Sequence, residues 1–198
     1  MLLIPFAFSA LFWFGAILQP WLPWLARQVL EYETHLSSEE TNLEDLTVVI
    51  PARNESAIIP QTLESLRGQG KNLHVIVVDD RSEDGTAEAA RGVTGINLTV
   101  VGGEPLPEGW AGKLWALEQG VRLVQTPLTL LLDADIFLDQ GAIAALKRIQ
   151  RQGRSLVSVM AELHMSSFWE KLMLPAFILY FNNLYPFALA NSPDKRVA

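Results

Sequence analysis

The stretch that most constrains the fold is residues 127–135, with the sequence Pro-Leu-Thr-Leu-Leu-Leu-Asp-Ala-Asp. An uncharged run of mostly branched side chains is typical of a strand that is buried on both faces of a parallel sheet. Two carboxylates, Asp133 and Asp135, then follow at the carboxyl end of this strand. Open α/β sheets bind their ligands at that end, in the crevice formed by the loops that leave the strand tips. The stretch therefore predicts an α/β fold with an acidic site at one edge of its sheet.

Asp133 and Asp135 are candidate ligands of a divalent cation. Separated by one residue, they would share a face in a strand, and in a turn both could face one ion. Two carboxylates about 4 Å apart repel by on the order of 4 kcal/mol at an effective dielectric of about 20, and a cation between them removes that cost. Mg²⁺ or Mn²⁺ fits, because these ions take carboxylates, water and substrate phosphates. The alternative is an aspartate pair that caps a turn before the next helix.

The preceding chain predicts a parallel βαβαβ unit. Its strands are expected at residues 46–50, 73–78 and 97–101, and a further strand is expected at residues 155–160. The first strand leads into Pro-Ala-Arg-Asn-Glu at residues 51–55, and the second into Asp-Asp-Arg-Ser-Glu-Asp-Gly-Thr. Polar residues thus follow each of these strands at the end where a ligand would bind.

Lys113 stands at the end of a loop rich in glycine and proline. The apolar spacing of Leu114, Leu117 and Val121 predicts that a helix begins here and packs on the sheet through these residues. A lysine in the first turn opposes the helix dipole, and an anion bound at this position would remove the conflict. The loop is not a Walker A motif, because Pro107 replaces its first glycine. An exposed surface lysine is the alternative.

Residues 2–26 contain no charged side chain, and the run is long enough for a membrane span of about 20 residues. We therefore predict a membrane anchor at residues 1–27, in preference to a signal peptide or a buried helix. Trp21 and Trp24 fit an interfacial aromatic belt, and Arg27 favours a cytoplasmic position for the following chain. The expected location is the inner membrane, with the domain that follows the anchor in the cytoplasm.

The net charge of −7 is concentrated in an acidic segment at residues 28–45, which is interpreted as a linker or a solvated surface. There is no basic face for nucleic acid, and no cysteine. The basic side of the helix after Asp135 is interpreted as solvated, with lipid headgroups as an alternative. The aromatic segment at residues 166–198 is expected to lie in a membrane interface or over the active site, with a core helix as the alternative.

Together, these motifs in this order resemble the GT-A fold of family 2 glycosyltransferases over residues 46–160. The string Gly-Trp-Ala-Gly-Lys-Leu-Trp-Ala at residues 109–116, the apolar N-terminus and Phe-Trp-Glu-Lys at residues 168–171 are most similar to the hopene-associated glycosyltransferases. The predicted fold is α/β, with a GT-A-type, mostly parallel sheet flanked by helices over residues 46–165. An N-terminal membrane helix is expected before it, and the C-terminal part of the fold is expected to be missing.

The resemblance implies a site for a nucleotide-sugar donor. Glu55 with Asp79 or Asp80 would hold the uracil and ribose of a UDP-sugar, Lys113 would contact the diphosphate, and Asp133 and Asp135 would hold the metal. The full set of residues expected at the donor is Pro51, Ala52, Arg53, Glu55, Asp79, Asp80, Lys113 and Asp133. The expected acceptor is a lipid, with a hopanoid as the specific prediction.

The catalytic base is not assigned, because the family places it beyond the last predicted strand. Glu162 and His164 offer a carboxylate and an imidazole, but neither matches the family motif. The base is expected beyond Ala198, so the chain is interpreted as a fragment or a truncated product that binds nucleotide poorly and turns over little alone. A non-catalytic nucleotide-sugar-binding module and a nucleotidyltransferase are the alternatives, although residues 51–55 lack the glycine that a nucleotidyltransferase needs.

Overall fold

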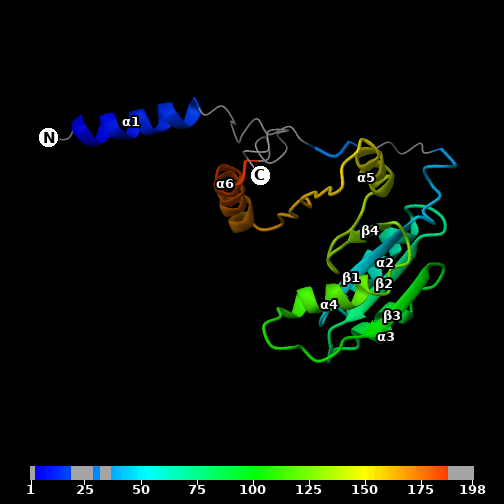
Figure 1. The fold of residues 1–198 in the computed structure, drawn as a ribbon. Coiled ribbons are helices and arrows are strands. Elements are labelled where there is room, and N and C mark those ends of the chain that lie inside the picture. The colour runs from blue at the N-terminus through cyan, green and yellow to red at the C-terminus, as the bar shows by residue number, and fades with distance from the viewer. Residues whose placement is uncertain (1–2, 19–28, 32–36, 187–198) are drawn as a thin grey trace. The chain divides into compact units, whose positions relative to one another are not determined.

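A computed structural model of the chain describes residues 3–18, 29–31 and 37–186 (Figure 1). The chain divides into two compact units, which are described separately. One unit is Leu30–Ala161, and the other combines Met1–Val29 with Glu162–Ala198.

The Leu30–Ala161 unit is built on a parallel sheet with the strand order β3-β2-β1-β4. The strands are β1 Leu46–Ala52, β2 His74–Asp79, β3 Asn97–Gly102 and β4 Leu128–Leu131. Val48 of β1 lies opposite Val75 of β2 and Leu130 of β4, and all neighbouring strands run in the same direction. The predicted α/β fold with a parallel sheet is therefore confirmed.

One face of the sheet packs against α2 Ile59–Arg67, α3 Thr86–Arg91 and α5 Ala142–Arg151. Val48, Ile50, Val75 and Val77 point to this side and are fully buried. Alternate side chains of a strand point to opposite faces, so Ile76 and Val78 face the other side. There they pack against Ala116 of α4 Gly112–Val121.

Helix α4 packs through a different face from the one that the sequence predicts. Its buried residues are Trp115, Ala116 and Gly120, whereas Leu114 is 58% exposed and Val121 42% exposed. The small residues Ala116 and Gly120 allow the helix to lie close to β1 and β2. The prediction that the Leu114 and Val121 face packs on the sheet is therefore wrong.

Gly120 is expected to be required for this close packing. A Cβ atom at position 120 would lie 2.4 Å from Val49 Cγ1 and 3.0 Å from Val78 Cγ2. Alanine usually stabilises a helix relative to glycine, but here the overpacking should dominate and cost about 1–3 kcal/mol. Urea unfolding of Gly120→Ala should therefore show a lower midpoint than the wild type.

Gly68→Ala is the matched control for Gly120→Ala. Gly68 ends α2 with an ordinary φ of −76°, and its added Cβ would meet only Ser65 O at 3.6 Å. This variant should be neutral or more stable by up to about 1 kcal/mol, because alanine restricts the unfolded chain. If Gly120→Ala were as stable as Gly68→Ala, the close approach of α4 to the sheet would be contradicted.

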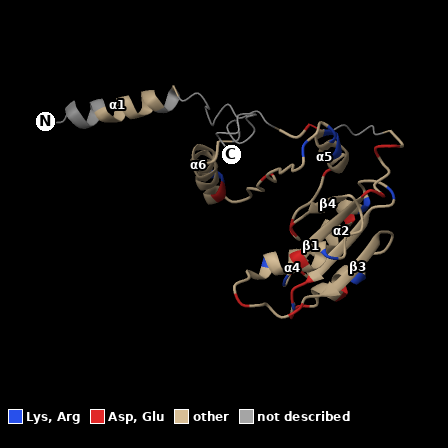
Figure 2. Ribbon diagram, viewed as in Figure 1, with Lys and Arg blue, Asp and Glu red and all other residues tan. Residues whose placement is uncertain are grey.

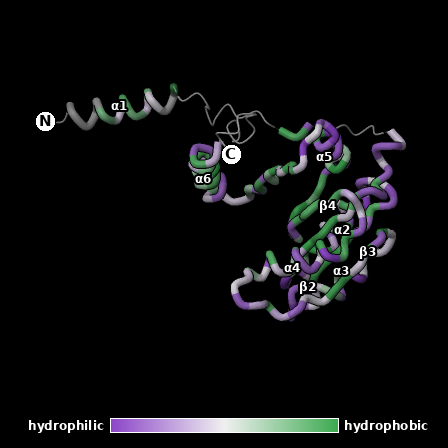
Figure 3. Tube along the Cα trace, in the orientation of Figure 1, coloured by the Kyte–Doolittle hydropathy of each residue, from purple (hydrophilic) through white to green (hydrophobic). Residues whose placement is uncertain are grey.

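Strand β4 is one of the two edge strands of the described sheet, and Leu131 is 53% exposed. The expected burial of this strand on both faces is wrong, because α4 packs over β1 and β2. Its hydrophobic character is nevertheless plain in Figure 3. Residues 155–160 form no strand, so that prediction is also wrong. An apolar run does not hold an extended conformation without a strand beside it.

The acidic segment pairs with the basic side of α5, where Figure 2 shows clustered basic residues. Asp45 Oδ1 lies 2.6 Å from Lys147 Nζ, and Glu40 Oε1 lies 2.6 Å from an Arg148 nitrogen. The Ser37 backbone N–H and the Arg148 guanidinium lower the pKa of Glu40 to about 2. Residues 37–45 therefore form part of this unit, and the basic side of α5 contacts them, which differs from the expected linker and solvated helix face.

The other unit contains α1 Leu3–Ile17 and α6 Phe168–Leu184. Among the residues that the structure describes, neither helix combines the length and hydrophobicity that a membrane crossing needs. The predicted anchor also includes residues 19–27, which lie outside the described residues. Ser167 precedes α6 and caps its start, because its side chain forms a capping box with Glu170, and no residue of α6 is buried within its own unit. The interfacial, active-site and core-helix interpretations of this segment stay predictions.

Candidate functional site

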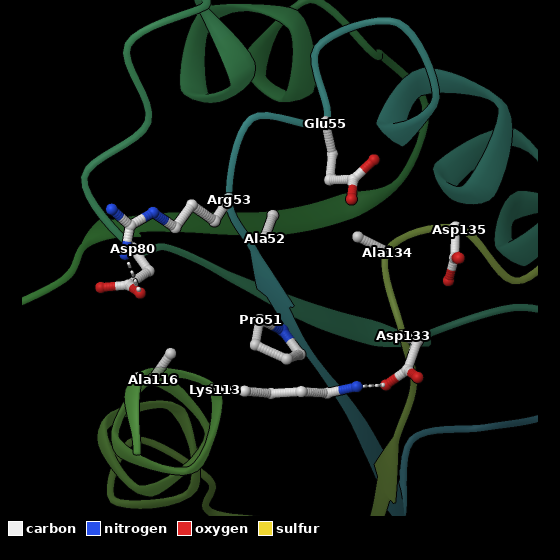
Figure 4. A pocket seen from close by; sticks show the side chains of 11 residues that line it. Pro51, Ala52, Arg53, Glu55, Asp80, Lys113, Ala116, Asp133, Ala134 and Asp135 are labelled. Carbon is white, nitrogen blue, oxygen red and sulfur yellow. Dashed lines mark ion pairs between the residues drawn. The ribbon is translucent and has the colours of Figure 1, made fainter. Parts of the chain in front are cut away.

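A cleft of about 340 Å³ opens at the carboxyl ends of β1 and β4, beside the first turn of α4. Figure 4 shows its side chains converging from these elements. The lining residues are Pro51, Ala52, Arg53, Glu55, Asp80, Gly112, Lys113, Ala116, Asp133, Ala134 and Asp135. The cleft thus brings together side chains from four separate parts of the chain.

Side chains of the loop after β2 hold the loop after β1 in place. The backbone N–H groups of Asn54, Glu55 and Ser56 donate to Ser82 Oγ, Thr86 Oγ1 and Asp84 Oδ2, at 2.9, 2.8 and 3.0 Å. Donation by the Thr86 hydroxyl and by the Ser56 N–H lowers the pKa of Asp84 to about 2. The carboxylate is therefore ionised at neutral pH, and its hydrogen bond to the loop after β1 persists there.

Asp80 lies at one side of the cleft and is 6% exposed. Its Oδ2 is 3.5 Å from Arg53 Nη1, an ion pair that Figure 4 draws. A Cβ atom at position 112 would lie 3.2 Å from Asp80 Oδ2, so Gly112 leaves room for this carboxylate. A buried acceptor next to an arginine donor can bind a ligand that has both an N–H group and an acceptor.

Lys113 and Asp133 meet across the cleft. Lys113 Nζ extends from α4 to Asp133 Oδ1 at 2.7 Å. Their side chains are 59% and 51% exposed, so water screens the pair and its contribution to stability is small. A partly exposed ammonium group at a helix start is placed to bind an anionic ligand instead.

The donor set fits a divalent cation that a ligand helps to hold. The described residues contain no group of three or more His, Cys, Asp or Glu side chains arranged to hold a metal ion. Asp133 and Asp135 nevertheless line the same cleft. Mg²⁺ is commonly bound by one or two carboxylates together with water and substrate phosphates. Two aspartates therefore suffice for an ion that arrives with a diphosphate.

The structure places every residue predicted at the donor or the metal in this cleft except Asp79. Alternation along β2 directs the Asp79 side chain to the same face as Val77, away from α4. Its Oδ1 is buried without a hydrogen-bond partner. Sequence reasoning offered Asp79 or Asp80 for the nucleoside, and Asp80 is the one that lines the cleft.

Asn54, Ser82 and Asp84 were missed as site-forming residues. They do not line the cleft, but they fix the loops that do, because Asn54 Oδ1 also accepts from Glu83 N at 3.0 Å. The signal in the sequence was the density of Asn, Ser and Asp in loops directly after strands. Such side chains commonly bond to nearby backbone groups.

The family description Glycosyl transferase family 2 matches residues 47–195, and the chain belongs to this family. A 4,4'-diaponeurosporenoate glycosyltransferase of Staphylococcus haemolyticus is 31% identical over 149 residues, which are 73% of this chain and 38% of the relative. The protein of that name from Staphylococcus aureus is 38% identical over 121 residues, covering 60% of this chain and 32% of the relative.

The chain therefore spans about a third of the length of the curated relatives it matches. Among solved structures, mannosyltransferase PcManGT from Pyrobaculum calidifontis in complex with GDP-Man and Mn²⁺ is 30% identical, with a TM-score of 0.46, covering 63% of this chain and 36% of that one. Residues 1–349 of S. aureus TarS in complex with UDP are 23% identical, with a TM-score of 0.45 and coverage of 55% and 32%. The narrower likeness to hopene-associated enzymes stays a prediction.

Proposed function

We propose that the cleft binds a nucleotide-diphosphate sugar, most simply a UDP-sugar, and that the chain is the donor-binding part of a glycosyltransferase with a lipid acceptor. The observation that carries the proposal is that Asp80, Lys113 and Asp133 line one cleft of about 340 Å³. The nucleotide base, the diphosphate and a cation would then each face a side chain of suitable charge. The curated relatives are named for 4,4'-diaponeurosporenoate, which supports a lipid acceptor.

Each side chain has a role that its position favours. Asp80 accepts hydrogen bonds from the nucleotide base, and its contact with Arg53 keeps the carboxylate oriented. Glu55 lies above the same cleft, where its carboxylate can accept from the ribose hydroxyls. Pro51 and Ala52 form the floor at the end of β1.

The chemistry requires a stabilised leaving group. The bond from the anomeric carbon to the diphosphate oxygen breaks as an acceptor oxygen attacks, and negative charge grows on the diphosphate. The Lys113 ammonium group is placed to stabilise that charge once the diphosphate replaces Asp133 as its partner. Asp133 and Asp135 would hold Mg²⁺ or Mn²⁺, which adds Lewis-acid stabilisation when bound. The base that removes the acceptor proton is not assigned.

Membrane association is part of the proposal. The described side chains of α1 include exposed Leu11, Phe12 and Trp13, and those of α6 include exposed Phe168 and Trp169. Exposed apolar side chains that gather on one segment are typical of surfaces that contact a membrane or another protein, and a membrane contact suits a lipid acceptor. An inner-membrane location with the cleft in the cytoplasm would bring a lipid acceptor, a hopanoid or a carotenoid-like lipid, to the donor.

Titration of the full chain in detergent with nucleotides tests the donor assignment. In calorimetry, UDP and UDP-glucose should bind weakly to the chain alone, as expected from the sequence, but more tightly with Mn²⁺ than with EDTA, and more tightly than ATP does. GDP and GDP-mannose would distinguish a guanosine donor. An absence of nucleotide binding in Mn²⁺, or a preference for ATP, would contradict the proposal.

A further inference from the structure

Three polar side chains of α2 and its end bond to the loop that carries the aspartate pair. Thr62 Oγ1 donates to Ala134 O at 2.6 Å, and Thr62 is fully buried. Ser65 Oγ accepts from Leu138 N at 3.2 Å. Gln69, which is 2% exposed, donates to Leu138 O and Asp139 O and accepts from Ile143 N.

Among these three residues, Thr62 is the one that bonds to the peptide between the two aspartates. Ala134 is the residue between Asp133 and Asp135, and its carbonyl accepts the Thr62 hydroxyl proton. Ala134 is itself 6% exposed, so water does not offer its carbonyl an easy replacement. Fixing this peptide restricts the backbone from which both carboxylates extend.

Apolar packing does not require a hydroxyl at position 62. Valine has nearly the same shape as threonine and would fill the same volume. A buried polar side chain that bonds to a loop 72 positions away indicates a need for one particular loop conformation.

We infer that Thr62 is a positioning residue for the Asp133 and Asp135 carboxylates, through its hydrogen bond to Ala134 O, with Ser65 and Gln69 extending the support along the loop. The ligand in this inference, a nucleotide with its cation, is taken from the proposed function. The hydrogen bond of Thr62 to Ala134 O is independent of that proposal. Groups that orient metal ligands typically change metal affinity by roughly 10–100-fold when they are removed. Thr62 should therefore affect the Mn²⁺-dependent part of nucleotide binding.

Thr62→Val is the test, and Thr47→Val is its matched control. Thr47 is also fully buried, and its Oγ1 accepts from Thr126 Oγ1 at 2.8 Å near the start of β1, far along the strand from the cleft. Both variants remove one hydroxyl from a buried position. A merely structural role for Thr62 would make the two variants behave alike.

Hydrogen–deuterium exchange of the ligand-free chain is the first measurement. Thr62→Val should accelerate exchange of residues 134–139 relative to the wild type and to Thr47→Val, while Thr62→Ser should restore slow exchange. Equal exchange of this segment in the two valine variants would overturn the inference whatever the chain binds.

Calorimetry with UDP is the second measurement. Thr62→Val should weaken UDP binding in Mn²⁺ by roughly 10-fold and leave binding in EDTA unchanged, whereas Thr47→Val should change neither. An equal loss in Mn²⁺ and EDTA would overturn the inference. If the wild type binds no nucleotide, the proposed function fails, and the exchange result still decides the role of Thr62.

Ser65→Ala provides a second test of the loop support in case Thr62→Val does not fold. It removes the acceptor of Leu138 N while leaving the Thr62 contact in place. The expected result is faster exchange at Leu138 and a smaller loss of UDP affinity in Mn²⁺ than Thr62→Val causes. Unchanged exchange at Leu138 would count against the loop support by α2.

Discussion

Lys113→Met is expected to weaken UDP binding by about 10- to 100-fold, the equivalent of the roughly 1.5–3 kcal/mol that a hydrogen bond to a charged group contributes. Methionine keeps an unbranched side chain of similar length but loses the ammonium group that the structure directs into the cleft. The fold should be unaffected, because the Lys113 pair with Asp133 is half exposed. Calorimetry with UDP measures the loss, and urea unfolding checks the fold.

Two variants complete the Lys113 experiment. Lys113→Arg keeps the charge and should retain most of the affinity, with some loss because the guanidinium is larger and planar. Lys71→Met removes an exposed lysine that does not line the cleft, so it controls for the change in net charge. If Lys113→Met bound UDP as tightly as Lys71→Met, the position of the diphosphate beside α4 would be contradicted.

The sheet was predictable from sequence because its strands are short apolar runs that alternate with helices. The predicted strand at residues 46–50 corresponds to β1 Leu46–Ala52, and the one at residues 97–101 to β3 Asn97–Gly102. Acidic and basic residues directly after such runs necessarily meet at one end of a parallel sheet. This rule brings Asp80 and Asp133 to one end of the sheet, and Lys113 joins them from the start of α4.

The wrong predictions for the packing face of α4 and the burial of β4 have a common physical origin. Both depend on packing between elements, which the sequence of one element does not determine. Helix α4 offers two apolar faces, and the choice between them depends on how closely Gly120 approaches Val49 of another element. The exposed face of β4 likewise depends on which strands α4 covers. Periodicity along one helix or strand cannot rank such alternatives, because both satisfy the same pattern.

The hydrogen bonds that fix the loops of the cleft could not be predicted from the sequence, for a related reason. Thr62 and Gln69 fit the polar side of an amphipathic helix and its end, yet both are buried and bond to a loop about 70 positions away. Asp84 and Ser82 hold the loop after β1 from the loop after β2. Side chain to backbone bonds at long sequence separation leave no periodic signal.

Asp133→Asn is expected to give opposite results with and without a divalent cation. The carboxylate pairs with Lys113 at 2.7 Å, so in EDTA it competes with a diphosphate for the ammonium group and also repels it. Removing its charge should strengthen UDP binding in EDTA by up to about tenfold, allowing for solvent screening of groups that are half exposed. In Mn²⁺ the wild type should gain affinity, and the variant should not, because one of its two carboxylate ligands is gone.

The opposite effects of Asp133→Asn on UDP affinity in EDTA and in Mn²⁺ distinguish a metal ligand from a residue that only shapes the cleft. Titrations of wild type, Asp133→Asn and Asp135→Asn with UDP should be run in EDTA and in Mn²⁺. Asp135 forms no ion pair with Lys113 in the structure, so Asp135→Asn should lose the Mn²⁺ effect with a smaller gain in EDTA. If Asp133→Asn kept the full Mn²⁺ effect, the cation would have to be held elsewhere, and the lysine pair would be the only role left for Asp133.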